Sequence, residues 1–488
     1  MLKYLFSLIL IPLSLTAIAQ TDIDALNYSR WSSGATARSL AVGGAFGALG
    51  GDISTMNTNP AGLGVFRKSE IALTPAFNLN NISADFNGNI VDTDKNKFRF
   101  AGVGAAFVQL NDDPGVDWKS VTWGISYNQL ANLDKKFVYE NTTTGSIVET
   151  LLEANGYPEN ELLDLEWLAF KTTLIDTIEG YTNQYVSPLN ENSTLLKTEN
   201  FQSKGSVYDL ALSVGGNYRH KLYVGATLGL PIVNYKQEAT YREEDENGMY
   251  NDFDEMRLTS GFTTTGIGVN LKIGAIYKIN RTYRAGLAVH TPTNFGLTDT
   301  EYYIEMSKFP SDNPQERIDY GTLEYNLKTP WRVIASGSAV VRNMGFFSAE
   351  VEWLNYGKNE YSFSYTEEEC ETCQADAIRI NDVISSKYRS AINARLGAEY
   401  TYNKLRARIG YAYYGDPFEP NPDINIVSGV RHNVSFGLGI RPKSVYLDLA
   451  FVRNIQKELY VPYVAERSPE ITNDIGNNSI VLTAGLKF

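Results

Sequence analysis

Apolar and polar side chains alternate along most of this chain with the two-residue period of a β-strand. The alternation is strictest over residues 477–488, where one face carries Ile480, Leu482, Ala484, Leu486 and Phe488. Side chains two residues apart point to the same side of a sheet, so this strand has one apolar face and one mixed face. The same pattern predicts fourteen strands, at 69–80, 98–110, 120–141, 205–219, 222–243, 256–279, 282–305, 321–341, 345–365, 388–402, 405–416, 430–442, 445–462 and 477–488.

The links between these strands alternate in length after the second pair of strands. Short links lie at His220-Lys221, Asn280-Arg281, Arg342-Asn343, Asn403-Lys404 and Pro442-Lys443. Long links lie at 143–204, 244–255, 306–320, 366–387, 417–429 and 463–476. An even number of strands, each long enough to cross a bilayer when tilted, predicts an all-β fold, a 14-stranded antiparallel transmembrane β-barrel. A closing strand of a β-sandwich is the alternative interpretation of residues 477–488.

The two faces of the predicted strands differ as the two sides of a barrel wall should. Tyr208, Leu210, Leu212 and Val214 alternate with Asp209, Ala211 and Ser213. Val434, Phe436, Leu438 and Ile440 alternate in the same way with Asn433, Ser435, Gly437 and Gly439. Charges facing lipid cost about 2–4 kcal/mol at the bilayer midplane, so the polar sets are expected inside. The same argument places these charged residues in the lumen, where they are expected to pair: Glu350, Glu352, Arg395, Glu399, Arg408, Arg441 and Asp448.

The N-terminus has the features of a secretory signal peptide, residues 1–19. Lys3 supplies a positive charge, Leu5 to Leu15 an apolar stretch, and Ala17-Ile18-Ala19 a small-residue cleavage site. No later run reaches the roughly 18–20 apolar residues of a membrane helix. A lipoprotein is not expected either, because there is no Cys near the cleavage site. The 31 Tyr, 22 Phe and 6 Trp fit the aromatic girdles of a barrel. The net charge of −13 argues against a nucleic-acid partner.

Small residues dominate the segment between the signal and the first strand. Residues 33–39 and 42–52 are rich in Gly, Ala and Ser, but they match neither phosphate-loop motif, and no Lys follows them. Nucleotide binding is therefore not expected. Pro60 removes a backbone donor and fixes φ, while Gly62 and Gly64 permit turns that other residues resist. The composition instead favours close packing of backbone in a confined space.

This segment runs into Asn59-Pro60-Ala61, just before the first strand, and here it resembles the hatch of the FadL-type outer-membrane long-chain fatty acid transporters. The resemblance implies an N-terminal lumenal hatch at 20–68, with Asn59, Pro60 and Ala61 in gating, and a barrel at 69–488. It also implies passive uptake of hydrophobic small molecules across the cell outer membrane, with exit through a gap at a kinked third strand. Gly124 and Asn128-Gln129 are the candidate kink positions, although no clear motif marks them. A structural turn without a gating role is the alternative for residues 59–61.

The chain ends on Phe488, which resembles the C-terminal assembly signal of bacterial outer-membrane barrels. The expected partners are therefore a hydrophobic small-molecule ligand, outer-membrane lipid and the barrel assembly machinery, with the protein itself a monomer. A surface receptor or adhesin displayed on a barrel, including a haem-binding one, is the rival hypothesis. The scarcity of His argues mildly against haem.

The longest loop, 143–204, changes to a helical period. Ser146 and Glu149 form a capping box, and Gly156 can end the helix that follows. A second helix is predicted after Pro158, with an apolar stripe and further leucines beside it: Leu163, Trp167, Phe170 and Leu174, then Leu162, Leu165 and Leu168. The stripe is either a groove at the cell surface that captures substrate or the interior of a helical hairpin.

Cys370 and Cys373 form a C-x-x-C in an acidic loop, where a local disulfide is expected rather than a metal site. The three His residues, His220, His290 and His432, are scattered, and no nucleophile is spaced to work with them. We therefore expect no enzyme activity, no cofactor and no metal. The substrate itself is not named by the sequence.

Overall fold

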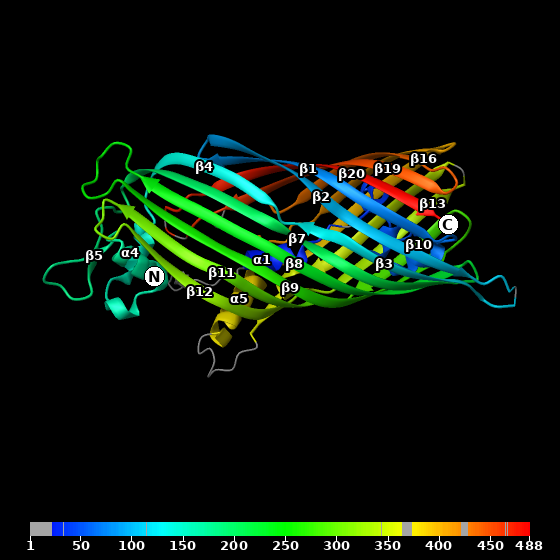
Figure 1. Ribbon diagram of the computed structural model, residues 1–488, viewed down its shortest axis with the longest axis horizontal. Coiled ribbons are helices and arrows are strands. Elements are labelled where there is room, and N and C mark those ends of the chain that lie inside the picture. Colours follow the sequence, from blue (N-terminus) through cyan, green and yellow to red (C-terminus); the bar gives the residue numbers. More distant parts are fainter. Residues whose placement is uncertain are drawn as a thin grey trace, which may run out of the picture.

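The protein is a closed antiparallel β-barrel of fourteen strands (Figure 1). The structure, a computed structural model, describes residues 22–32, 34–113, 115–342, 344–363, 373–420, 428–463, 465 and 467–488. Ten barrel strands are continuous: β1 (Glu70–Phe86), β2 (Asn89–Leu110), β7 (Thr194–Tyr218), β8 (Leu222–Glu244), β9 (Glu255–Lys278), β16 (Ser390–Tyr402), β17 (Leu405–Tyr414), β18 (Arg431–Ile440), β19 (Val445–Tyr460) and β20 (Ile471–Lys487). Four are each split in two: β3 (Trp118–Asn132) with β4 (Lys135–Thr144), β10 (Tyr283–His290) with β11 (Asn294–Phe309), β12 (Gln315–Lys328) with β13 (Arg332–Val341), and β14 (Gly345–Asn355) with β15 (Glu360–Ser362).

The first and last strands close the cylinder. β1 pairs with β20 from Glu70 opposite Lys487 to Phe86 opposite Ile471. The N–H of Phe488 donates to the carbonyl oxygen of Ser69 at 3.0 Å, which extends this seam to the last residue. The two ends of the sheet are thus paired with each other, as a sheet that lies in a bilayer requires.

The outer wall is apolar and the inner wall polar, as the alternation predicted. Leu438 is 64% exposed on the outside, whereas Ser435 and Asp209 are fully buried inside. Of the seven charged residues predicted to face the lumen, six are buried, including Glu350, Arg395 and Asp448, and Arg441 is partly buried. No helix among the described residues is long and apolar enough to cross a membrane.

Strand ends at the long-loop end differ from the predictions. Residues 81–97, expected as a loop, continue the hairpin of β1 and β2. β7 begins at Thr194 instead of 205, and β20 at Ile471 instead of 477. In these extensions the outward side chains are mostly polar, while the inward face carries buried apolar residues such as Ile82, Phe86 and Ile475, so the apolar outer face that marks a lipid-facing strand is missing there. The breaks in the four split strands leave no such signal either.

Residues 22–68, which we call the lumenal segment, lie inside the barrel (Figure 1). The segment contains α1 (Asp22–Ser29), α2 (Ala37–Leu40) and two short 3-10 helices, η1 (Ile53–Met56) and η2 (Pro60–Val65). It fits because the wall offers glycines on its inner face. A Cβ on any of these would collide with backbone or side chains of the segment: Gly104, Gly124, Gly215, Gly225, Gly274, Gly286, Gly397, Gly410 and Gly437.

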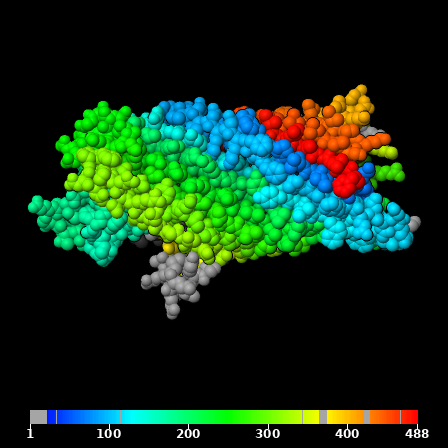
Figure 2. All heavy atoms as spheres, in the orientation of Figure 1, coloured from blue at the N-terminus to red at the C-terminus, as the bar shows by residue number. Residues whose placement is uncertain are grey.

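The long-loop end carries small helices, and the space-filling view shows the loop between β4 and β7 projecting there (Figure 2). This loop holds α3 (Val148–Leu151), η3 (Leu152–Ala154), η4 (Glu159–Glu161), α4 (Asp164–Lys171) and the short strands β5 (Asp176–Thr177) and β6 (Tyr185–Val186). Nearer β16 lie η5 (Tyr356–Lys358) and α5 (Cys373–Lys387), a helix the sequence analysis did not predict. The Ser146–Glu149 pair forms half of a capping box: Ser146 N–H donates to Glu149 Oε1 at 3.3 Å, but its hydroxyl accepts from Val148.

Candidate functional site

Asn59 joins two stretches of the lumenal segment to the barrel wall. Its Oδ1 accepts from Ala61 N–H at 3.2 Å, which caps η2, and Pro60 occupies the first helical position. Its Nδ2 donates to Gly47 O at 2.7 Å and to Ala275 O of β9 at 3.3 Å. Asn59 and Ala61 are buried. The three residues expected in gating therefore lie at a contact between segment and wall, and their gating role stays a prediction.

A buried ion-pair network holds the segment from β13, β14 and β16. Arg395 binds Glu350 at 2.7 Å and also contacts Glu352, and Arg332 binds Glu352 at 3.1 Å. Glu350 accepts the N–H of Gly47 at 2.8 Å. Arg332 donates to Ser29 O and lies 4.4 Å from the centre of the Trp31 ring. Removing one member would strand a buried charge, a change that typically costs about 3–5 kcal/mol.

A second network lies nearer the short-turn end. Arg408 bridges Glu399 and Asp448, each at 2.7 Å, and Arg441 also contacts Asp448. Arg38 of the lumenal segment joins through Glu399 at 3.4 Å and donates to Gly51 O. Both networks thus end on the segment, so the lumenal charges hold it as well as stiffen the wall.

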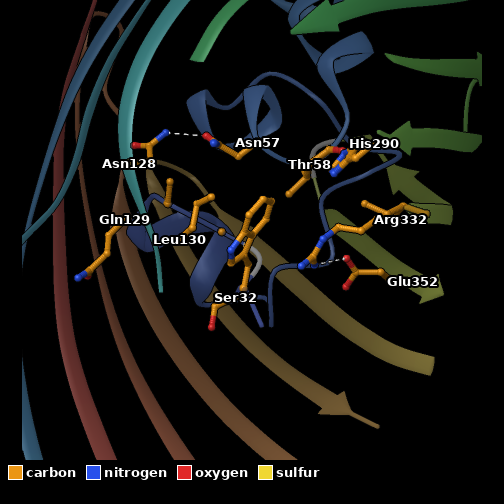
Figure 3. A pocket seen from close by; sticks show the side chains of 13 residues that line it. Ser32, Asn57, Thr58, Asn128, Gln129, Leu130, His290, Arg332 and Glu352 are labelled. Atoms are coloured by element: carbon orange, nitrogen blue, oxygen red, sulfur yellow. Dashed lines mark hydrogen bonds and ion pairs between the residues drawn. The ribbon is translucent and has the colours of Figure 1, made fainter. Parts of the chain in front are cut away.

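Asn57 and Thr58 face a third set of wall groups (Figure 3). Asn57 donates to Asp209 at 2.6 Å and accepts from Asn128 at 2.8 Å, while Asp209 also pairs with Lys272. His290 Nε2 donates to Thr58 O at 2.8 Å. The cavity beside these groups measures about 20 Å³, room for about one water. The segment therefore packs closely against the wall at this level.

The third barrel strand is interrupted beside this contact. β3 pairs with β2 only as far as Asn128 opposite Gly102, and its register against β7 shifts after Gln129. Asn128-Gln129 therefore adjoins the break, whereas Gly124 pairs without interruption. In the described part of the wall no ladder joins β4 to β2, and the gap is bridged by side chains such as Lys97 on Asp134 at 3.0 Å.

The predicted apolar stripe of the surface loop is divided between core and surface. Leu168 and Leu174 are fully buried, together with Leu165, in the cluster beneath the loop. Leu162, Trp167 and Phe170 pack against that cluster but stay partly exposed, and Leu163 is also half-buried. Lys171 Nζ lies 5.6 Å from the centre of the Trp167 ring and 5.5 Å from the centre of the Phe170 ring. Partial burial raises the pKa of Glu166, although its carboxylate accepts Leu163 N–H.

The remaining candidates are the two cysteines and the three histidines. Cys370 is outside the described residues, so the disulfide with Cys373 stays a prediction. His220 lies in a short turn and His432 on the outer wall, while His290 is buried. No group of metal-ligating side chains occurs in the described part of the chain.

No protein-family model and no curated protein matches the sequence. Several solved structures, in contrast, have a similar fold. A FadL homologue from Pseudomonas aeruginosa has a TM-score of 0.54 at 12% identity, covering 94% of this chain and 98% of that one. The toluene transporter TodX of P. putida scores 0.53 at 14% identity, covering 94% and 99%. The Ralstonia pickettii toluene transporter TbuX scores 0.50 at 14% identity, covering 93% and 99%.

The fold is that of the FadL-type channels. At these identities the likeness concerns the fold alone, and the position of each side chain comes from this chain. Within the FadL fold, sequence reasoning missed Arg332, Lys272, Arg38 and His290 as groups that hold the lumenal segment. Arg332 and Lys272 alternate with outward apolar residues, so the strand period could have placed them inside. Their links to the lumenal segment could not be found from the period, because that segment contains no strand: Arg332 donates to Ser29 O, and Lys272 acts through Asp209, which accepts from Asn57.

Proposed function

We propose that this protein is an outer-membrane channel for passive inward movement of hydrophobic small molecules, long-chain fatty acids among them. The lumenal segment acts as its hatch. The observation that carries the proposal is the apolar character of the lumen around α1 of the hatch. There, apolar side chains from at least six barrel strands and from α1 form one cluster, which includes Tyr28, Trp31, Leu130, Tyr235, Phe262 and Leu327. A lumen for polar solutes would be lined by polar groups and water.

The hatch contacts fit a part that must hold its shape and still move. Asn57, Asn59 and Gly47 each reach the wall through one or two hydrogen bonds, and the small residues around them present little surface to the wall. Such a bond contributes about 0.5–1.5 kcal/mol net, or about 1.5–3 kcal/mol where the acceptor is the carboxylate of Asp209 or Glu350, so a ligand that changes a few of them can shift the segment. The asparagine-proline-alanine turn lies at the centre of these contacts.

The route has two candidate ends. At the surface, Trp167 and Phe170 of α4 offer partly exposed aromatic faces for capture. In the wall, the break between β3 and β4 lies beside Asn128, which is hydrogen-bonded to the hatch at Asn57. Motion of the hatch would reach the break directly through this bond. We therefore propose that solutes leave sideways here, into the membrane, once the bridge between Lys97 and Asp134 opens.

Of the similar structures described above, two are toluene transporters and the third is a FadL homologue, which supports a transport role over a catalytic one. For this chain the proposal is a channel in the outer membrane with no catalytic step.

Uptake into cells tests the proposal. The protein, expressed in the outer membrane of a host that lacks its own fatty acid channel, should raise the initial uptake rate of labelled hexadecanoate several-fold. It should leave uptake of a labelled disaccharide unchanged. A matched strain expressing the chain without residues 145–193 separates capture from permeation. Surface binding of hexadecanoate without uptake, lost in the deletion strain, would instead establish the receptor function, and disaccharide uptake would indicate a general pore.

A further inference from the structure

The outer wall carries an apolar groove across β16, β17, β18 and β19, next to the short turns that join these strands. Its volume is about 440 Å³, within the range of roughly 300–1,000 Å³ that is common for ligand pockets. Strand pairing aligns its outward side chains in two rows: Tyr400, Ala407, Leu438 and Leu449, then Tyr402, Leu405, Ile440 and Leu447. Ala407 has the shortest side chain in these rows, so the hollow forms over it.

The side chains of the groove face away from the lumen. Tyr402 is 63% exposed, Leu438 64% and Leu405 54%. An exposed apolar surface of this kind is stable against hydrocarbon, and the tyrosines belong to the aromatic girdle that marks the edge of the hydrocarbon layer. The groove therefore runs from the hydrocarbon layer to the level of the lipid headgroups.

The two turns at the headgroup end of the groove are basic. Lys404 lies between β16 and β17, Lys443 lies between β18 and β19, and both side chains are exposed. The N–H of Arg441 donates to Lys404 O at 2.9 Å, so the two turns are in contact. Among the described residues neither lysine forms an ion pair, and the carboxylates on the adjoining strand ends, Glu399 and Asp448, are buried against arginines. Two positive charges are thus left for an anion from outside the chain.

Overall composition does not account for these cations, because the net charge of the chain is −13. Each of the short links named in the sequence analysis nevertheless contains a Lys or an Arg and no acidic residue. The acidic link at the same end, residues 111–117, joins β2 to β3 and is separated from β18 by β19, β20 and β1. Short turns of bacterial barrels face the periplasm, where the adjoining membrane leaflet consists of phospholipid.

We propose that this groove binds a phospholipid with a net negative headgroup, with one acyl chain over Ala407 and the phosphate between Lys404 and Lys443. Lys404 is two residues beyond Tyr402, at most about 7 Å further along the chain, so one lipid molecule can reach both the hollow and the lysines. A headgroup amine would neutralise the phosphate and meet two like charges. A second copy of the chain, docked groove to groove, would bring the lysines of both copies together. The site lies on the outer surface and does not depend on what crosses the lumen.

Native mass spectrometry of the purified protein in a non-ionic detergent tests the proposal. Equal concentrations of dioleoyl phosphatidylglycerol and dioleoyl phosphatidylethanolamine offer the same acyl chains with and without a net negative charge. The wild type should retain one phosphatidylglycerol per barrel in preference to phosphatidylethanolamine. Lys404→Gln combined with Lys443→Gln should lower phosphatidylglycerol retention roughly tenfold or more, to the level of phosphatidylethanolamine. Ala407→Phe should weaken retention of both lipids, because it fills the hollow with a side chain that the lipid face tolerates.

Two matched controls separate this site from general attraction to the barrel. Lys221→Gln combined with Arg281→Gln removes the same charge from exposed turns away from the groove, and Ala349→Phe adds the same ring on the outer face of β14. Both should retain phosphatidylglycerol as the wild type does. Folding of each variant is checked by its mobility on unheated gels.

Three results would overturn the proposal. One is equal retention of the two lipids by the wild type. Another is unchanged phosphatidylglycerol retention in the Lys404 and Lys443 double variant, or an equal loss in the Lys221 and Arg281 control, which would mean that charge acts around the whole rim. The third is a dimer without retained lipid, which would assign the groove to a second copy of the chain.

Discussion

Asn59 illustrates how one side chain holds the lumenal segment. The same amide group caps η2 and reaches Gly47 O and Ala275 O, so its loss removes a cap and leaves buried carbonyl oxygens unsatisfied. A lost cap costs about 0.5–2 kcal/mol and a stranded buried acceptor about 1–3 kcal/mol. The closed position of the segment therefore depends measurably on this residue.

Asn59→Ala should raise leakage of polar solutes through the barrel about tenfold or more, the change that a shift of roughly 1.4 kcal/mol in the closed state produces. Efflux of a fluorescent polar dye from reconstituted vesicles measures it. Asn96→Ala, at an exposed position on β2, is the control and should match the wild type. Equal efflux from all three proteins would mean that residues 59–61 form a turn without a gating role.

For single residues, the sequence predicted which side of the barrel wall a side chain faces, but not which groups it contacts. Leu212 and Leu438 were expected outside, and Asp209 and Ser435 inside, because lipid and lumen select opposite side chains on alternate positions. The bond from Gly47 N–H to Glu350 depends on the path of a glycine-rich segment through the lumen. Alternation carries no information about such a path.

Among the elements, α4 separates the two hypotheses about the surface loop. The buried side chains of Leu165 and Leu168 already anchor the helix. The exposed parts of the half-buried Trp167 and Phe170 are therefore not needed to hold it. The helix itself was predicted from its apolar period, whereas α3 is only one turn long. The periodicity could not show which residues of the stripe would meet the barrel rim.

Changing Trp167 and Phe170 to Ser should weaken hexadecanoate uptake while the loop stays resistant to protease. Burial of each aromatic against a ligand contributes on the order of 1–3 kcal/mol, so apparent affinity should fall roughly tenfold or more. Limited proteolysis and uptake are measured on the same preparations. Leu168→Ser is the comparison, since its side chain is fully buried and its loss should open the loop to protease. Cleavage of the double variant at the rate of Leu168→Ser would assign the stripe to packing.

The whole molecule behaves as one closed sheet, so its stability is cooperative around the cylinder. The count of fourteen strands was predicted correctly because every strand crosses between two unlike environments and is marked at both ends by a turn or a loop. The splits in four strands were not predicted, since each break keeps the apolar period on either side.

The mature protein should be heat-modifiable. Every strand is closed by its neighbours, so mild detergent at room temperature leaves the barrel folded and boiling opens it. Unboiled and boiled samples should migrate differently on a gel, and the unboiled sample should give a far-ultraviolet spectrum dominated by β-structure. Identical migration together with a helical spectrum would contradict the architecture.

The seam between β1 and β20 sets an order on assembly. Ala37 N–H donates to the Thr483 hydroxyl, a contact between residues 446 positions apart in sequence. Almost the entire chain must therefore be released before that bond can form, yet the early residues have to be inside when the cylinder shuts. The barrel wall consequently closes around the lumenal segment, which is synthesised before the wall. A barrel that closed first would exclude this segment. Correct biogenesis thus depends on timing between the two chain ends as much as on affinity.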